Sequence, residues 1–442
     1  MRALGASRTS VVAGGVLAGN WARDPLWKNA RAVPSLDLRF AENKSLTDAK
    51  TGASLVTFTR ASTGTYVGSD GVLQSATTNE ARFDHNPTTG ESLGLLVEEA
   101  RTNLITTSEA LANVTGSSIT NNTTTAPDGL VTADTLIEDT STGSHSVNTA
   151  SIIWAGNTEY TFTCFLKANT RTQVNIAFGT SSNWVNSQRN ATFDLSDGTV
   201  IATAGTSVTA SIEPFLNSWY RCRLTVTTVA APVPSAIQTQ MYVSGSASYT
   251  GNGTSDIFFW GAQLEAGAFP TSYIPTTTAT ATRAADVASI TGTNFSSFYN
   301  QTEGTVFADA KVTTVAPATY LTSVFALSDG TTSNRITVYK RANADTSTRL
   351  DATTSGSSVA FINAGTFSVS NLIAASYRVN DFAISLNGLT PETDTLGAIP
   401  TVSRLNIGNY ADSTFPLNGT IKRLTYFPVR LANPTLQAIA QP

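Results

Sequence analysis

Charged side chains are scarce in this sequence of 442 residues. Asp, Glu, Lys and Arg together make up 13% of it, against roughly 25% in a typical globular protein. The formal net charge is −4, and no cluster of Lys and Arg forms the basic patch by which proteins bind nucleic acid. We therefore expect no nucleic-acid partner. A disordered chain is also excluded, because disorder requires few apolar residues, and apolar residues here reach 41%.

Cysteine and histidine are nearly absent. Cys164 and Cys222 both lie in strand-like runs, which predicts two buried free thiols, with a disulfide between them as the alternative. His85 and His145 are the two histidines, so a catalytic triad that uses histidine has almost no candidates. The GxSxG, HExxH and phosphate-loop motifs are missing as well. We therefore expect that the protein is not an enzyme.

Long apolar runs are missing too. No run reaches the roughly 18 apolar residues of a transmembrane helix, so we expect no membrane insertion. The apolar residues instead occur in short alternating runs: Tyr160, Phe162, Cys164 and Leu166 share one parity and should face a core. Thr favours strands, while Ser, Asn and Gly favour turns. The composition therefore predicts an all-β protein with many short strands.

Turn-forming segments divide the chain into regions. Pro270 and Pro275 cannot donate to a β-ladder, and the Thr/Ala-rich run after them has little to bury, which predicts a connector between two domains. Regularly spaced strand-like runs on either side suit β-sandwiches. The predicted regions are an N-terminal arm (1–35), a small β-hairpin module (36–105), a jelly-roll sandwich (106–270), a linker (271–289) and a second sandwich (290–442).

The first 34 residues contain two tryptophans, Trp21 and Trp27, with no domain of their own to fill. The segment is either a flexible leader or an anchor whose indole rings dock into another subunit. We favour the anchor, because aromatic side chains are enriched in protein interfaces.

Two pairs of titratable residues need an interpretation. Asp84 and His85 precede a Pro-Thr-Thr-Gly turn and have no third partner nearby in the sequence, so we assign them to the turn rather than to catalysis. Glu98 and Glu99 are expected to begin a helical turn or to bond to Arg101 rather than to act as an acid/base pair.

Three blocks of sequence stand out: TFTRASTGTYVGSDGVLQSA with the segment up to residue 105, NSWYRCRLTV with residues 258–287, and EGTVFADAKV with residues 375–388 and 417–439. Together they resemble the modular tail-fibre and appendage proteins of tailed bacteriophages. The second block resembles the jelly roll of a carbohydrate-binding module, and the third resembles a concanavalin A-like sandwich of laminin G type. The resemblance implies an arm and small β-module, then a jelly roll, then a concanavalin A-like sandwich.

The same resemblance implies a function. It predicts a structural protein of the virion, as a tail fibre or similar appendage, which binds host surface polysaccharide during adsorption. It also implies a homotrimer that contacts other virion proteins. The alternative is a purely architectural capsid-decoration, head-fibre or baseplate protein without sugar binding, and a polysaccharide-cleaving enzyme is a third interpretation. No cofactor is expected, although structural calcium is common in both of the folds that the blocks resemble.

Sugars present C–H faces that stack on aromatic rings and hydroxyls that bond to amides. Trp184 lies in a polar loop with Asn183, Asn186 and Gln188, which makes this loop a candidate glycan site, and Tyr410 is a similar loop aromatic. A Trp that packs at the edge of a sandwich or against a neighbouring subunit is the alternative.

Calcium needs several oxygen ligands at loop positions. Asp128, Asp134, Asp256 and Asp329 lie in or near predicted loops, but their spacing is not diagnostic, so no metal site is predicted.

Overall fold

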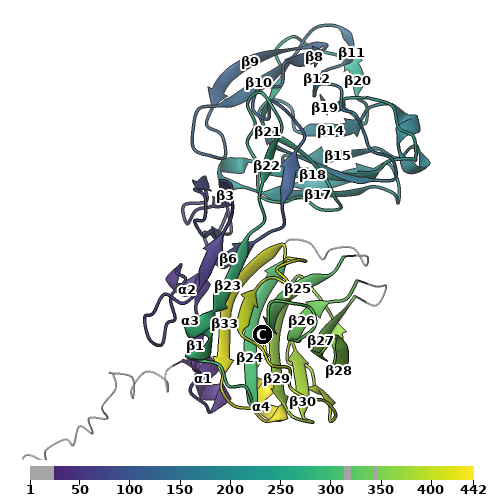
Figure 1. Cartoon of the computed structure of the whole chain (residues 1–442). Coiled ribbons are helices and arrows are strands. Elements are labelled where there is room, and N and C mark those ends of the chain that lie inside the picture. Colours follow the sequence, from purple (N-terminus) through teal and green to yellow (C-terminus); the bar gives the residue numbers. More distant parts are fainter. Residues whose placement is uncertain (1–23, 313–319, 343–345) are drawn as a thin grey trace, which may run out of the picture.

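The computed structural model describes residues 24–312, 320–342 and 346–442. It confirms an all-β protein, built from antiparallel sheets that form two sandwiches (Figure 1). The α-helices among these residues are short: α1 (Pro25–Ala30), α2 (Phe40–Asn43), α3 (Gly292–Ser296) and α4 (Asn433–Ile439). None of the helices in the described ranges is long and apolar enough to cross a membrane.

The jelly roll consists of two six-stranded sheets that enclose one core. The strands of the first sheet are, in spatial order, β17 (Thr209–Pro214), β18 (Tyr220–Thr227), β13 (Glu159–Ala168), β21 (Asp256–Ala266), β10 (Ala133–Glu138) and β9 (Ser117–Thr124). Those of the second sheet are β16 (Thr199–Thr203), β15 (Asn190–Asp194), β14 (Gln173–Phe178), β19 (Ile237–Met241), β12 (Ser146–Asn148) and β8 (Asn113–Thr115).

The two cysteines lie opposite each other in this core. Cys164 on β13 and Cys222 on β18 are register partners, and both are fully buried free thiols, as predicted. Burial raises the pKa of both thiols above the ordinary value, so they remain protonated and behave as small apolar side chains.

The C-terminal sandwich has an eight-stranded and a seven-stranded sheet. The larger sheet contains β31 (Glu392–Asp394), β30 (Phe382–Leu386), β29 (Ser370–Arg378), β24 (Glu303–Val312), β33 (Gly419–Phe427), β6 (Ser92–Val97) and β5 (Phe83–His85), with β1 (Leu36–Leu38) also paired to β33. The smaller sheet contains β2 (Thr57–Thr59), β23 (Val287–Thr291), β32 (Arg404–Ile407), β25 (Thr322–Ser328), β26 (Arg335–Lys340), β27 (Ser347–Thr354) and β28 (Ser357–Thr366).

These pairings correct the predicted division of the chain. Strands β1, β2, β5 and β6 come from residues 36–105, yet they extend the sheets of the C-terminal sandwich. Their apolar residues, such as Leu36, Phe58 and Val97, lie in the same core as Leu405. A separate 36–105 module is therefore wrong, because these short strands bury their apolar faces only in a sheet supplied from the far end of the chain.

The predicted linker is also a structured segment. Strand β22 (Ala281–Arg283) pairs with β7 (Arg101–Asn103), and β23 enters the seven-stranded sheet. Tyr273 and Ile274 are buried. The hairpin of β3 (Gly64–Val67) and β4 (Leu73–Ala76) lies where the two sandwiches meet (Figure 1).

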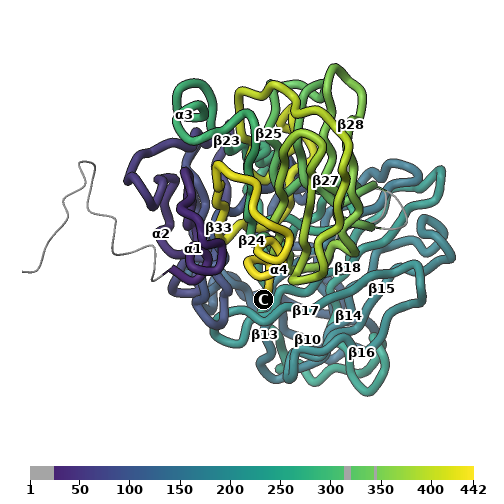
Figure 2. Tube along the Cα trace, turned by 90° about the horizontal axis from the view of Figure 1, so that it is seen from below, coloured from purple at the N-terminus to yellow at the C-terminus, as the bar shows by residue number. Residues whose placement is uncertain are grey.

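The N-terminal tryptophans do not form the predicted anchor together. Trp27 on α1 is 4% exposed and packs with α4 on the outer side of the eight-stranded sheet (Figure 2). Its indole Nε1 donates to Asp37 Oδ2 at 3.2 Å, and the Arg39 guanidinium lies 5.5 Å from the ring centroid. The indole is thus occupied within its own chain, which corrects the anchor assignment for Trp27. Trp21 lies outside the described residues.

A buried ionic network joins the ends of strands of the C-terminal sandwich to the segment that follows the jelly roll. Arg60 lies 3.2 Å from Asp286, and Arg82 contacts Asp286 and lies 2.8 Å from Glu98. Arg283 adds longer contacts to Glu98 at 3.5 Å and to Asp286 at 3.7 Å. All five side chains are buried. Three buried guanidinium groups therefore share two carboxylates as their counter-charges.

We predict that Glu98→Gln lowers the free energy of unfolding by about 3–5 kcal/mol, since it leaves buried guanidinium groups without a counter-charge. Burial raises the pKa of Glu98, but the charges of Arg283 and Arg82 outweigh it and hold the pKa at about 2. The stabilisation is thus present above the ordinary pKa of 4.5 and is lost as the pH falls toward 2. Denaturant titrations at several pH values measure both effects.

Glu91→Gln is the matched control. Its partner Lys422 lies 2.6 Å away, but Glu91 is more than half exposed, so the expected cost is below about 1 kcal/mol. An equal decrease in the free energy of unfolding for both variants would show that the buried network stabilises the fold no more than the exposed ion pair does.

Candidate functional site

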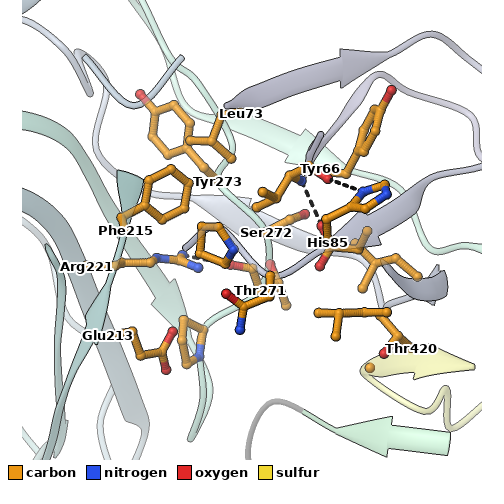
Figure 3. Close-up of a pocket in the computed structure, with 18 of the residues that line it drawn as sticks. Tyr66, Leu73, His85, Glu213, Phe215, Arg221, Thr271, Ser272, Tyr273 and Thr420 are labelled. Atoms are coloured by element: carbon orange, nitrogen blue, oxygen red, sulfur yellow. Dashed lines mark hydrogen bonds between the residues drawn. The ribbon is translucent and has the colours of Figure 1, made fainter. Parts of the chain in front are cut away.

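A cleft of about 440 Å³ lies where the jelly roll, the β3–β5 region and the C-terminal sandwich meet. Side chains converge on it from all three sides (Figure 3). Glu213 and Arg221 come from β17 and β18, His85 from β5, and Lys311 and Thr420 from β24 and β33. The volume is within the roughly 300–1,000 Å³ that is usual for small-molecule sites.

Aromatic and apolar side chains form much of the wall. Tyr66 on the hairpin and Phe215 and Tyr273 from the jelly-roll side line the cleft together with Leu73. Tyr66 is partly exposed, and its hydroxyl donates to Gln74 Oε1 at 3.0 Å. The Tyr273 hydroxyl is occupied within the chain by Ser108. Phe215 and Tyr273 are buried at 8% and 3% exposure, so Tyr66 is the ring of these three that offers a face to a ligand.

His85 supplies an uncommitted polar atom. Its side chain is 5% exposed, and Nδ1 lies 3.0 Å from the carbonyl oxygen of Val67 (Figure 3). A carbonyl only accepts, so Nδ1 must carry the proton in this contact. Nε2 is buried and has no hydrogen-bond partner among the described residues. His85 therefore presents one polar atom in the cleft wall that the described chain leaves unbonded.

Asp84 precedes His85 on β5 and also lines the cleft. The Val67 N–H donates to Asp84 Oδ1 at 2.7 Å. Burial raises the pKa of Asp84 to about 6, although this hydrogen bond opposes the shift. Despite its burial, the pKa of Glu98 is instead lowered, because the arginines of the buried ionic network favour its charged form. Glu99 bonds to Arg101 as expected.

Arg221 carries a positive charge into the cleft. Its Nη2 donates to the Thr271 carbonyl at 2.8 Å, and the guanidinium lies 5.7 Å from the Phe165 ring centroid. Nε is buried without a partner, and no carboxylate of the described residues lies within ion-pair distance. Glu213 is its register partner on β17 but does not form an ion pair with it.

A second, more open hollow of about 530 Å³ adjoins the cleft. Tyr66 and His85 line both hollows, so they form the wall between them. Lys44, Gln74 and Glu80 supply polar groups to the second hollow. A ligand longer than one sugar ring can therefore continue from the cleft across Tyr66.

The loop predicted to bind glycan does not present its tryptophan to solvent. Trp184 is 1% exposed, makes edge contacts with Trp154 and Phe178, and donates from Nε1 to the Gly179 carbonyl at 2.7 Å. The neighbouring amides are also used within the chain. Asn183 bonds to Val233 and Ser235, Asn186 to Ser207, and Gln188 to Ser207. The sugar-stacking role predicted for Trp184 is therefore wrong, and Asn183 is buried beside it, whereas the assignment of Asn186, which is exposed, and of Gln188 stays a prediction.

Tyr410 is likewise covered. It is 8% exposed and lies between Tyr339, Phe415 and the guanidinium of Arg335, whose carbon is 5.3 Å from the ring centroid. Phe415, at 49% exposure, is the aromatic side chain that this loop presents to solvent. Tyr410 therefore cannot stack on a sugar, and its predicted role is corrected.

The four loop aspartates are bonded mainly to their own surroundings. Asp134 accepts from the Asn122 N–H, Asp256 from Asn169 and Thr170, and Asp329 from Thr331 and Asn334; Asp128 accepts from the Leu130 N–H. Among the residues that the structure describes, no group of three or more His, Cys, Asp or Glu side chains is placed to hold a metal ion.

The sequence did not reveal this cleft as the candidate site. Asp84 and His85 do precede a turn, but they also line the cleft, and the jelly-roll and C-terminal walls of the cleft come from residues far away in the sequence, such as Arg221 and Lys311. A local signal existed: a His–Asp pair in a protein with two histidines and few charges. A search along the neighbouring sequence could not show that Arg221 of β18 lines the same cleft.

No protein-family model matches the sequence, and neither does any of the curated proteins. Among solved structures, the CBM40 of Ruminococcus gnavus IT-sialidase bound to alpha2,6 sialyllactose is 18% identical over 32% of this chain and 84% of that chain, with a TM-score of 0.28. Domains LG4-5 of the mouse laminin alpha1 chain are 8% identical over 75% of this chain and 88% of that chain, with a TM-score of 0.21.

Trypanosoma rangeli sialidase in complex with the inhibitor DANA is 9% identical over 74% of this chain and 62% of that chain, with a TM-score of 0.26. At such low TM-scores, none of these similarities carries an argument about function. The functional argument therefore rests on the cleft and on the sequence blocks.

We predict that Asp84→Asn flattens the dependence of stability on pH. Since the folded state raises the pKa of Asp84 to about 6, its contribution to stability is complete below pH 4 and is lost as the pH rises through 6. Between pH 5 and pH 7 the free energy of unfolding of the unsubstituted protein should fall by about 1–2 kcal/mol more than that of the Asp84→Asn variant. Asp128→Asn, in a turn outside the cleft, is the control. An unchanged pH profile for Asp84→Asn would contradict the assignment.

Proposed function

We propose that this protein binds glycans in the cleft between its two sandwiches and that it does so without cleaving them. The observation that carries the proposal is the cleft itself, which combines an apolar ring face with polar atoms that have no hydrogen-bond partner among the described residues. Tyr66, which is partly exposed, provides a face for the C–H groups of a sugar, while His85 Nε2 and Arg221 Nε form no bond within the described chain.

We further propose that the protein is an appendage of a tailed bacteriophage, such as a tail fibre, and that glycan binding serves adsorption to the host. The three sequence blocks support this proposal. The arrangement of the chain is compatible with it: helix α1, where the described chain begins, lies at the end of the C-terminal sandwich remote from the jelly roll (Figure 1). The jelly roll would then point away from an attachment site reached through the N-terminus.

Trimer formation is part of the same proposal. A cleft of this size binds one or a few sugar residues, and single contacts of this kind are weak. Three linked copies raise the effective concentration of the second and third sites, so that weak contacts give firm attachment. A stable monomer at micromolar concentration, seen by size-exclusion chromatography with light scattering, would count against a trimer.

A purely architectural role is the second candidate, and one observation favours it. The loop aromatics that the sequence suggested as sugar platforms, Trp184 and Tyr410, are both buried within the chain. If the cleft also binds no sugar, the sandwiches serve as building blocks of the particle. The same binding experiment distinguishes the two roles.

The test is binding of the full-length protein to an array of bacterial capsular polysaccharides and O-antigens. We expect saturable binding to a subset, weakened about tenfold by Tyr66→Ala, because an aromatic sugar platform contributes about 1–1.5 kcal/mol. Tyr242→Ala is the matched control: this tyrosine is also partly exposed with one hydroxyl bond, to the Gly245 carbonyl, but it lies outside both hollows.

Three results would change the conclusion. Absence of binding by the correctly assembled protein favours the architectural role. Equal loss in both tyrosine variants places the glycan site elsewhere. Release of reducing ends from a bound polysaccharide shows that the protein is an enzyme, with Asp84 as the first carboxyl group to substitute.

A further inference from the structure

The charges around the cleft indicate which class of sugar it binds, provided that the proposed glycan binding is correct. Arg221 forms no ion pair with the described residues, and its Nε is buried without a hydrogen bond. In most buried settings an arginine lies beside a carboxylate, because an isolated charge is costly to remove from water. An arginine that lines a cleft without such a partner is suited to a carboxylate on a ligand.

Two further basic groups line the same cleft. Lys311 on β24 is partly exposed and forms no ion pair within the described ranges. His85 presents Nε2, which donates a hydrogen bond when the ring is doubly protonated and accepts one from a hydroxyl when it is neutral. Both forms suit an acidic sugar, which offers carboxylate oxygens and hydroxyls together.

The acidic groups of the cleft oppose this charge only in part. Glu98 is neutralised by Arg82 and Arg283 in the buried network. Asp84 is held by the Val67 N–H, and burial favours its neutral form. Glu213 is the remaining carboxylate that can repel an anion, and it lies on the jelly-roll wall opposite Arg221 in the β17–β18 register.

We infer that the cleft binds an acidic glycan, in which the carboxylate of a sugar residue pairs with Arg221 and the same glycan bonds to His85 Nε2. The sugar ring rests against Tyr66, the partly exposed ring of the aromatic wall. Neighbouring sugar residues continue across Tyr66 into the second hollow. Neutral polysaccharides of the same backbone lack the charge that Arg221 requires and bind more weakly.

The two histidines provide a direct measurement. Full-length protein labelled with ¹³C at histidine Cε1 should give one imidazole signal from His85 and one from His145. His145 is an internal reference, because it is buried in the jelly roll with its ring nitrogens against the carbonyls of Gly116 and Tyr249. The probes are matched pairs that differ in the carboxylate: glucuronate against glucose, and galacturonate against galactose. Glucose 6-sulfate tests whether any anionic group suffices.

We expect the His85 signal to shift saturably with the acidic member of at least one pair, at about tenfold lower concentration than with its neutral partner, while His145 stays in place. Arg221→Gln should remove this preference, and Glu213→Gln should strengthen binding of the acidic sugar. Because Arg221 also bonds to the Thr271 carbonyl, Lys311→Gln is the second variant, chosen because the Lys311 side chain forms no ion pair with the described residues.

Each contrary result has a separate meaning. Equal shifts with acidic and neutral sugars, or an acidic preference that survives in both Arg221→Gln and Lys311→Gln, overturns the inference but keeps the glycan site. A shift with glucose 6-sulfate as large as that with glucuronate also overturns the choice of a carboxylate. No His85 shift with any probe overturns the inference outright. The polysaccharide array then tells whether glycan binding itself has failed.

Discussion

The structure depends on a buried group of five charges, Arg60, Arg82, Glu98, Arg283 and Asp286. Charges removed from water are tolerable only when their partners are in place, so the segments that carry them can take few other arrangements. These segments are the end of β2, the approach to β5, the end of β6 and the former linker. The network therefore fixes these segments against one another beside the junction of the two sandwiches, in a protein that uses charge sparingly elsewhere.

The network also shapes the cleft. Glu98 accepts hydrogen bonds from the backbone and the hydroxyl of Ser272, both at 2.7 Å. Arg82 donates to the Thr65 carbonyl at 2.8 Å, next to Tyr66. Two opposite parts of the wall are thus attached to the same ion pair. Because the cleft lies between segments that the network holds, its form does not rely on the mobility of loops, and its orphan polar atoms are held ready for a ligand.

The sequence could predict what depends on local pattern, and it failed where distant segments meet. Alternation revealed the strands of the jelly roll, and the apolar neighbours of Cys164 and Cys222 revealed two buried thiols. The strands before residue 105 were recognised as strands, but not as edges of a sheet completed by β33. Trp184 looked exposed because its neighbours are polar, yet the ring turns back onto Trp154. Local composition cannot show the direction in which a side chain turns.

The scarcity of charge makes the few unpaired charges informative. In a surface rich in Lys and Glu, one arginine without a carboxylate would mean little, because solvated charges are common. In this protein, Arg221 and Arg223 lie two positions apart on β18 but in different environments. Arg223 is buried in the interior, whereas Arg221 lines the cleft. An exposed guanidinium is inexpensive to keep in water, but a buried Nε without a partner is not. A ligand carboxylate would give Arg221 the ion pair that the described residues do not supply, and on this ground we propose an acidic glycan.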